Sequence, residues 1–164
     1  MAHPQTQSRP VGCAVITVSD TRTVETDRSG QIIQTLLAEA GHQIHDYRIV
    51  PDEPSRIGPL CQALAQRAEV DSIILTGGTG IAPRDTTYDA IAALIEKTLP
   101  GFGEIFRQLS FQEIGSRAIA SRAVAGVYQS TLIFSLPGSS NAVTLAMKAL
   151  ILPELPHLVS QIQG

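Results

Sequence analysis

Three glycines within four residues form the segment of this sequence best suited to chemistry. The turn reads Thr76-Gly77-Gly78-Thr79-Gly80 and follows a short apolar run. Glycines permit positive φ angles, so several N–H groups of such a turn can point toward one anion. The lysine of a Walker A loop is missing, and Pro83 breaks the dinucleotide-binding pattern. The turn is therefore either a different kind of phosphate site or a tight strand-to-helix connection without a ligand.

Charged residues follow the turn directly. Arg84 offers a cation for phosphate, and Asp85 offers a carboxylate that can hold Mg²⁺ or orient a nucleophile. Asp85 is equally suited to capping the helix predicted from Thr87. Asp89 lies three residues after Thr86, which is typical of a capping arrangement, so we expect Asp89 to be structural.

Other polar residues follow predicted strands. Ser19 and Asp20 come after the first strand, and Asp52 follows the second, where it lies at the same rim or caps the next helix. Ser139, after Pro137 and Gly138, opens a helix and can offer its hydroxyl and N–H to an anion, although capping alone explains it.

Hydrophobic patterning places these residues on an alternation of strands and helices. The predicted strands cover residues 11–18, 44–50, 70–75, 118–128 and 130–136, and the last two are a candidate antiparallel pair. The first predicted helix covers 29–40, with Ser29 as the cap and Gly41 as the stop, and the second carries Leu60, Cys61, Leu64 and Ala68 on one face, with its start left open by Gly58-Pro59. Further helices are predicted from 87, over 102–109, from 140, and over 153–162.

This alternation predicts an α/β fold, a three-layer α/β/α sandwich with a mostly parallel sheet. In such folds ligands bind beyond the carboxyl ends of the strands, which gathers loops 19–22, 51–53, 76–89 and 136–140 into one candidate site. We expect residues 1–10 to be a disordered segment and residues 11–164 to be a single domain.

Composition restricts the classes of partner. The net charge is −3 and the basic residues are scattered, which argues against a nucleic-acid-binding surface. We expect no stretch of the sequence to reach the ~20 apolar residues of a membrane span. The two cysteines match no metal spacing and suit a reducing compartment. We therefore expect a cytoplasmic protein with neither nucleic acid nor membrane as a partner.

In combination, these motifs resemble the MoaB/MogA family of molybdenum cofactor biosynthesis proteins, which is related to the gephyrin G domain. The matching segments are AVITVSDTR (14–22), SG (29–30), EAGH (39–42), VPDEP (50–54), LTGGTGIAPRDTTYDAI (75–91), PGFGEIFR (100–107) and LPGSSNAV (136–143). They follow one another over nearly the whole chain. The residues after Asp85 and the short C-terminal part resemble the MoaB branch.

The resemblance implies a homo-oligomer, a trimer or, in the MoaB branch, a hexamer, which other molybdenum cofactor biosynthesis proteins could contact. It implies binding of molybdopterin and transfer of AMP to it from ATP with Mg²⁺, releasing pyrophosphate. Asp52 and Asp85 are then the expected catalytic residues, with Asp85 as the candidate Mg²⁺ ligand. The expected substrate-binding residues are Ser19, Asp20, Thr76, Gly77, Gly78, Thr79, Gly80, Arg84, Pro137, Gly138 and Ser139. No permanently bound cofactor is expected.

Two alternatives stay open at this point. A non-catalytic molybdopterin-binding or carrier protein would keep the Gly-rich turn and fail to turn over ATP. An assembly partner with a silent pocket would bind no pterin at all.

Overall fold

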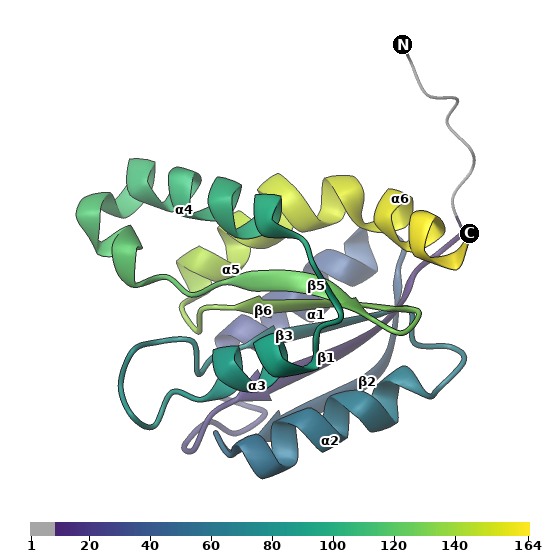
Figure 1. Ribbon diagram of the computed structural model, residues 1–164, viewed down its shortest axis with the longest axis horizontal. Helices are drawn as coiled ribbons and strands as arrows, with labels where there is room; N and C mark the ends of the chain where they lie inside the picture. Colours follow the sequence, from purple (N-terminus) through teal and green to yellow (C-terminus); the bar gives the residue numbers. More distant parts are fainter. Residues whose placement is uncertain (1–8) are drawn as a thin grey trace.

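The computed structural model describes residues 9–164, which form one six-stranded sheet between two layers of helices (Figure 1). The strand order is β2-β1-β3-β6-β5-β4. The strands are β1 (Gly12–Val18), β2 (Gln43–Val50), β3 (Ser72–Thr76), β4 (Lys97–Thr98), β5 (Val124–Tyr128) and β6 (Thr131–Leu136). β2, β1, β3 and β6 are parallel, whereas β5 is antiparallel to both β6 and β4. The predicted three-layer α/β/α sandwich is confirmed.

Helices cover both faces of the sheet, which is why its central strands are apolar on both sides. One face carries α1 (Arg28–Glu39), α4 (Pro100–Ile114), α5 (Ser140–Ala146) and α6 (Leu152–Gln163). The other face carries α2 (Pro54–Ala65) and α3 (Thr87–Leu94). All seven residues of β1 are buried as a result.

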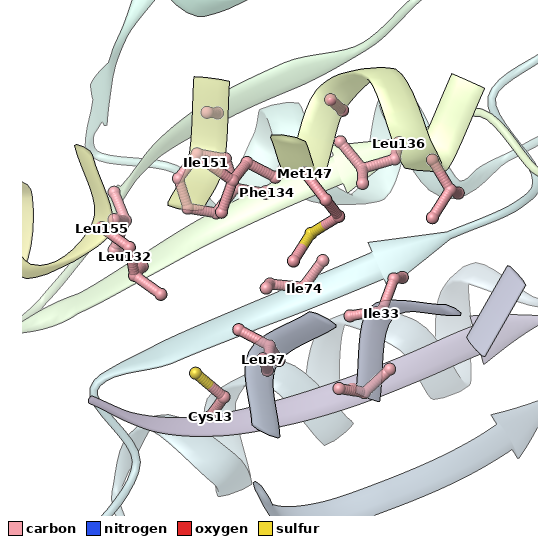
Figure 2. Packing of buried hydrophobic residues seen from close by; sticks show 14 of the residues in the cluster. Cys13, Ile33, Leu37, Ile74, Leu132, Phe134, Leu136, Met147, Ile151 and Leu155 are labelled. Carbon is pink, nitrogen blue, oxygen red and sulfur yellow. The ribbon is translucent and has the colours of Figure 1, made fainter. Parts of the chain in front are cut away.

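The larger core cluster lies under α1, α5 and α6. Figure 2 shows Ile33 and Leu37 of α1 facing Ile74 of β3, with Met147 and Phe134 on the neighbouring side. The smaller cluster, under α2 and α3, is built around Ile57, Leu64, Ile73 and Ile91, among others.

Each core cluster contains one cysteine. Cys13 lies in the larger cluster and Cys61 in the smaller, and both are fully buried. Burial, aided for Cys13 by the Asp71 carboxylate, raises the pKa of each thiol to about 12. Both side chains are therefore protonated, inert core residues at neutral pH.

Three predicted elements need correction. Residues 115–120 form a 3-10 turn, and the strand expected over 118–128 begins at Val124. Ile119 in that turn is 86% exposed, which a strand of the buried sheet would not allow. Helix α2 ends at Ala65 rather than 68. The terminal helix expected over 153–162 continues from α5 through the π-helical turn Met147–Ile151.

The helical run Ser140–Gln163 is 24 residues long and contains an 18-residue stretch with a mean hydropathy of 1.4, enough by length and composition to cross a membrane. The expectation that no apolar run reaches that length was therefore wrong. Its inward residues, including Val143, Met147, Ile151 and Leu155, are buried in the larger core cluster. Packing against the sheet accounts for these inward residues, and a third of the apolar stretch is buried.

Two predicted helix caps are made differently. Asp27, not Ser29, caps α1, because its carboxylate accepts a hydrogen bond from the Gly30 N–H at 3.0 Å. The stop at Gly41, with φ of 85°, is confirmed. Thr86 precedes α3 without a side-chain cap, and Asp89 accepts from Arg122 at 2.7 Å instead of completing a capping arrangement.

The described chain begins inside the segment that was expected to be disordered. Residues 1–8 of that segment lie outside the described part. Arg9 belongs to the fold, because its guanidinium donates to both carboxylate oxygens of Asp71 at 2.9 Å and to Gln163 at 2.8 Å. These bonds join Arg9, the first described residue, to the residue before β3 and to the end of α6. They lie at the amino ends of the parallel strands, opposite the candidate site.

Candidate functional site

The carboxyl ends of the parallel strands hold the predicted loops together. The Gly77 N–H donates to the Leu136 carbonyl at 3.0 Å, and the Thr76 hydroxyl donates to the Pro137 carbonyl at 3.0 Å. The Ser19 N–H donates to the Val50 carbonyl at 2.9 Å. Loops from β1, β2, β3 and β6 therefore meet at one edge, as the sequence predicted.

The Gly-rich turn needs its glycines for two different reasons. Gly77 and Gly78 have φ angles of 100° and 68°, which other residues rarely adopt. Gly80 has no positive φ, but a Cβ there would lie 2.6 Å from the Asp85 carboxylate. The N–H groups of residues 78–80 donate to no acceptor within residues 9–164. Three successive unbonded amides form a suitable anion-binding surface.

Two pockets lie on either side of this turn. We call the first, with a volume of about 270 Å³, the arginine pocket. Its lining residues are Thr17, Val18, Ser19, Arg22, Asp27, Arg28, Ser29, Thr76, Gly77, Gly138, Ser139 and Ser140. We call the second, with a volume of about 410 Å³, the Asp85 pocket. Its lining residues are Gly78, Thr79, Gly80, Asp85, Phe106, Ser110, Ile114, Arg117, Ala120, Ser121, Pro137, Gly138, Ser139 and Ala142.

The arginine pocket presents two cations to a ligand. Arg22 and Arg28 are exposed, and neither forms an ion pair within the described part of the chain. The amino end of α1, with its partial positive charge, lies at the same place. Unpaired guanidinium groups beside a helix amino end attract phosphate or carboxylate groups.

A buried carboxylate supports the wall of the arginine pocket. Asp27 is 2% exposed and accepts hydrogen bonds from the hydroxyls of Thr17, at 2.6 Å, and of Tyr47. Burial and this bond to Asp27 raise the pKa of Tyr47. The network joins β1, β2 and the start of α1, so it fixes the positions of the loop that carries Arg22 and of Arg28 beside it.

The Asp85 pocket combines a carboxylate, a cation and apolar walls. One oxygen of Asp85 accepts from the Ala82 N–H at 3.1 Å, and the other has no hydrogen-bond partner among residues 9–164. Arg117 has no ion-pair partner within residues 9–164, and Phe106 and Ile114 form the apolar wall. This mixture suits a ring system that carries an anionic group.

Gly138 and Ser139 line both pockets and separate them. The Ser29 hydroxyl donates to the Gly138 carbonyl at 2.7 Å, which ties this loop to α1. The Ser139 hydroxyl accepts from the Ala142 N–H at 3.1 Å, so it caps α5 as one of its predicted roles. Groups bound in the two pockets would meet at this shared wall.

Arg84 and Asp20 lie against each other rather than facing a pocket. The Arg84 guanidinium donates to both Asp20 oxygens at 2.7 and 2.8 Å. Asp20 also accepts from the Asp52 N–H at 3.2 Å, and together these bonds lower the pKa of Asp20. Arg84 thus connects the Gly-rich loop to the loop after β1, and its expected role in binding phosphate stays a prediction.

Asp52 stabilises the Gly-rich loop through hydrogen bonds to Thr86. Its carboxylate, 6% exposed, accepts from the Thr86 hydroxyl at 2.6 Å and from the Thr86 N–H at 3.2 Å. A Cβ on Gly78 would lie 2.5 Å from it. Asp52 lines neither pocket and does not cap α2, which follows Glu53. Its expected catalytic role stays a prediction.

Sequence reasoning missed several residues of this site. Arg22, Asp27 and Arg28 belong to the polar loop between the first strand and helix, and their position at the predicted binding edge was the available signal. Arg117 gave no such signal, because it lies beside a segment wrongly predicted to be a strand.

Comparison with known proteins identifies the family of the chain. Residues 14–157 match the family described as "Probable molybdopterin binding domain". The chain belongs to this family. A relative from Bacillus subtilis (strain 168), named molybdenum cofactor biosynthesis protein B, is 55% identical over 162 residues, which cover 98% of this chain and 95% of the relative.

Solved structures of the family share the fold. A crystal structure of a molybdenum cofactor biosynthesis protein B has a TM-score of 0.92 and 47% identity, and covers 95% of this chain and 98% of its own. The tungsten cofactor synthesizing protein MoaB from Pyrococcus furiosus has a TM-score of 0.85 and 34% identity, and covers 95% and 99%. The chain is thus a molybdenum cofactor biosynthesis protein with a molybdopterin-binding domain.

Proposed function

We propose that the protein binds molybdopterin and transfers AMP to it from Mg·ATP, releasing pyrophosphate. The observation that supports this proposal is the pair of anion-attracting pockets that share Gly138 and Ser139. A nucleotidyl transfer requires two phosphate-bearing substrates in contact, and most of its catalysis comes from positioning and charge neutralisation.

In this reaction the terminal phosphate of molybdopterin attacks the α-phosphate of ATP, and the bond to pyrophosphate breaks. Arg22 and Arg28 neutralise phosphate charge in one pocket, and the unbonded amides of residues 78–80 do so in the other. Asp85, with one oxygen that accepts no hydrogen bond from the described residues, orients the groups that react between them. Asp52 holds Thr86, and with it the loop that carries Asp85.

The residues fit a Mg²⁺ ion that arrives with ATP. Within residues 9–164, no group of three or more His, Cys, Asp or Glu side chains can hold a metal ion. Mg²⁺ commonly binds through one or two carboxylates and substrate phosphates, which requires no such group. The free oxygen of Asp85 supplies one ligand, and the ion would neutralise phosphate charge.

Pyrophosphate release tests the proposal. Purified protein with molybdopterin, ATP and Mg²⁺ is expected to release pyrophosphate, and Asp85→Asn is expected to lower kcat at least about 100-fold while molybdopterin still binds. Glu154→Gln, an exposed change on α6, is the control. Molybdopterin binding without pyrophosphate release from the unaltered protein would identify a carrier, and no binding would identify a silent pocket.

We further propose a cytoplasmic homo-oligomer, a trimer or a hexamer. Four large apolar side chains on α4 and the turn after it are exposed, namely Ile105, Phe111, Ile114 and Ile119. Apolar surface of this kind often marks a subunit interface. Light scattering of the purified protein is expected to give the mass of a trimer or a hexamer, and a monomer mass would contradict it.

A further inference from the structure

Arg122 contacts the Gly-rich loop and the helix after it with one guanidinium group. Its Nη1 donates to the Gly80 carbonyl at 3.2 Å, and its Nη2 donates to Asp89 at 2.7 Å. The guanidinium carbon also lies 4.2 Å from the centre of the Tyr88 ring. These partners belong to the end of the turn and the first part of α3, whereas Arg122 itself lies just before β5.

The loop has few other contacts near Gly80. Ile81, the next residue, is 77% exposed, so no apolar side chain fixes this part of the loop in the core. Asp20 and Asp52 hold Arg84 and Thr86, which lie in the second half of the loop. Gly77 bonds to Leu136, the Gly78 carbonyl accepts from the Thr87 N–H at 3.1 Å, and Thr79 is buried, so the bond from Arg122 is the contact that holds the next residue, Gly80.

The position of Gly80 matters to the Asp85 pocket. A Cβ on Gly80 would lie 2.6 Å from the Asp85 carboxylate, so the two groups pack directly against each other. Both line the Asp85 pocket, as does Ser121, the residue before Arg122. Arg122 thus connects one wall of this pocket to the wall opposite.

We infer that Arg122 is a positioning residue that holds Gly80, and through it Asp85, in the geometry needed for reaction. The inference rests on the function proposed above for this pocket. Arg122 lines neither pocket, so it acts through the loop rather than on the substrate. Its ion pair is partly exposed, with 28% of the Arg122 side chain and 64% of that of Asp89 accessible, so its loss should leave the fold intact.

Hydrogen exchange on the full chain tests the inference without requiring turnover. In Arg122→Gln the amides of Ala82 and Thr87, which donate to Asp85 and to the Gly78 carbonyl, are expected to exchange about tenfold faster, with β1 and β3 unchanged. Asp89→Asn keeps the bond to Gly80 and should exchange nearly as the unaltered protein does. Arg48→Gln, which removes an exposed ion pair on β2, is the matched control.

Kinetics separate positioning from a merely structural role. Arg122→Gln is expected to lower kcat about tenfold with the KM for ATP changed less than about twofold, because a displaced Asp85 affects reaction more than binding. Arg122→Lys restores the charge without the planar fork and should recover part of kcat. Unchanged exchange in Arg122→Gln overturns the inference, as does faster exchange with unchanged kcat. If the unaltered protein releases no pyrophosphate, the proposed function fails and the exchange result still decides the role of Arg122.

Discussion

Gly138 approaches Gly77 so closely that a Cβ on Gly138 would lie 3.3 Å from the Gly77 Cα. This contact joins the loop after β6 to the loop after β3 at the wall shared by the two pockets. The backbone of Gly77 is further restricted by the Val18 carbonyl, which a Cβ would approach to 2.2 Å. Three strands therefore meet at a point where side chains do not fit.

Gly77→Ala is expected to destabilise the fold by at least about 2 kcal/mol and to abolish molybdopterin binding, because it adds a clash to a φ of 100°. Gly138→Ala should cost only about 1 kcal/mol, since its neighbour can move slightly. Gly101→Ala, which meets nothing within 4 Å, is the control. Denaturant unfolding measures the loss of stability, and calorimetry measures the loss of molybdopterin binding. Equal losses of stability in Gly77→Ala and Gly138→Ala would contradict this prediction.

Asp52→Asn is expected to cost about 1–3 kcal/mol of stability and to speed amide exchange in residues 84–87, because an NH2 group replaces one of the two charged oxygens that accept from Thr86. Thr86→Val removes the hydroxyl bond alone and should do less. Loss of turnover in Asp52→Asn without faster exchange would instead show that Asp52 acts on the substrate.

Tyr47→Phe is expected to cost about 1–2 kcal/mol at neutral pH, because Asp27 loses a buried hydrogen bond. The pKa of Tyr47 is raised by folding, so the stabilisation is complete below the unfolded value of about 10 and is lost as the pH rises through the folded value. The difference in unfolding free energy between the two proteins should therefore shrink in alkali. Tyr128→Phe is the control, because this half-buried tyrosine at the β5–β6 hairpin accepts from the exposed Gln129 side chain rather than bonding to a carboxylate. A pH-independent difference would refute the assignment.

Arg22→Gln and Arg28→Gln are each expected to weaken molybdopterin binding about tenfold, the effect of one lost charge-assisted bond to an anion. The double variant should lose roughly a hundredfold if the two groups act independently. Arg48→Gln, paired with Asp46 on β2, is expected to bind normally. Calorimetry at two salt concentrations measures this, and equal affinity in all variants would exclude the arginine pocket as the site of the molybdopterin phosphate.

The residues of the Gly-rich turn could be predicted because local rules act on adjacent residues. Glycines mark positive φ angles, and strand ends mark the binding edge. The partners of Arg84, Asp52 and Asp89 could not be predicted, because each is at least 32 residues away in the sequence. Tertiary packing alone brings them together. The cap of α1 was missed for the same reason: the Ser29 hydroxyl donates to the distant Gly138 carbonyl, and Asp27 caps the helix.

The two buried cysteines make the unaltered protein a convenient background for spectroscopic probes. Neither thiol is accessible or ionised at neutral pH, so maleimide reagents should leave both unmodified in the folded state. A single cysteine introduced at the exposed Ile81 would then be the sole labelling position. A fluorophore there would report directly when a ligand changes the surroundings of the Gly-rich loop.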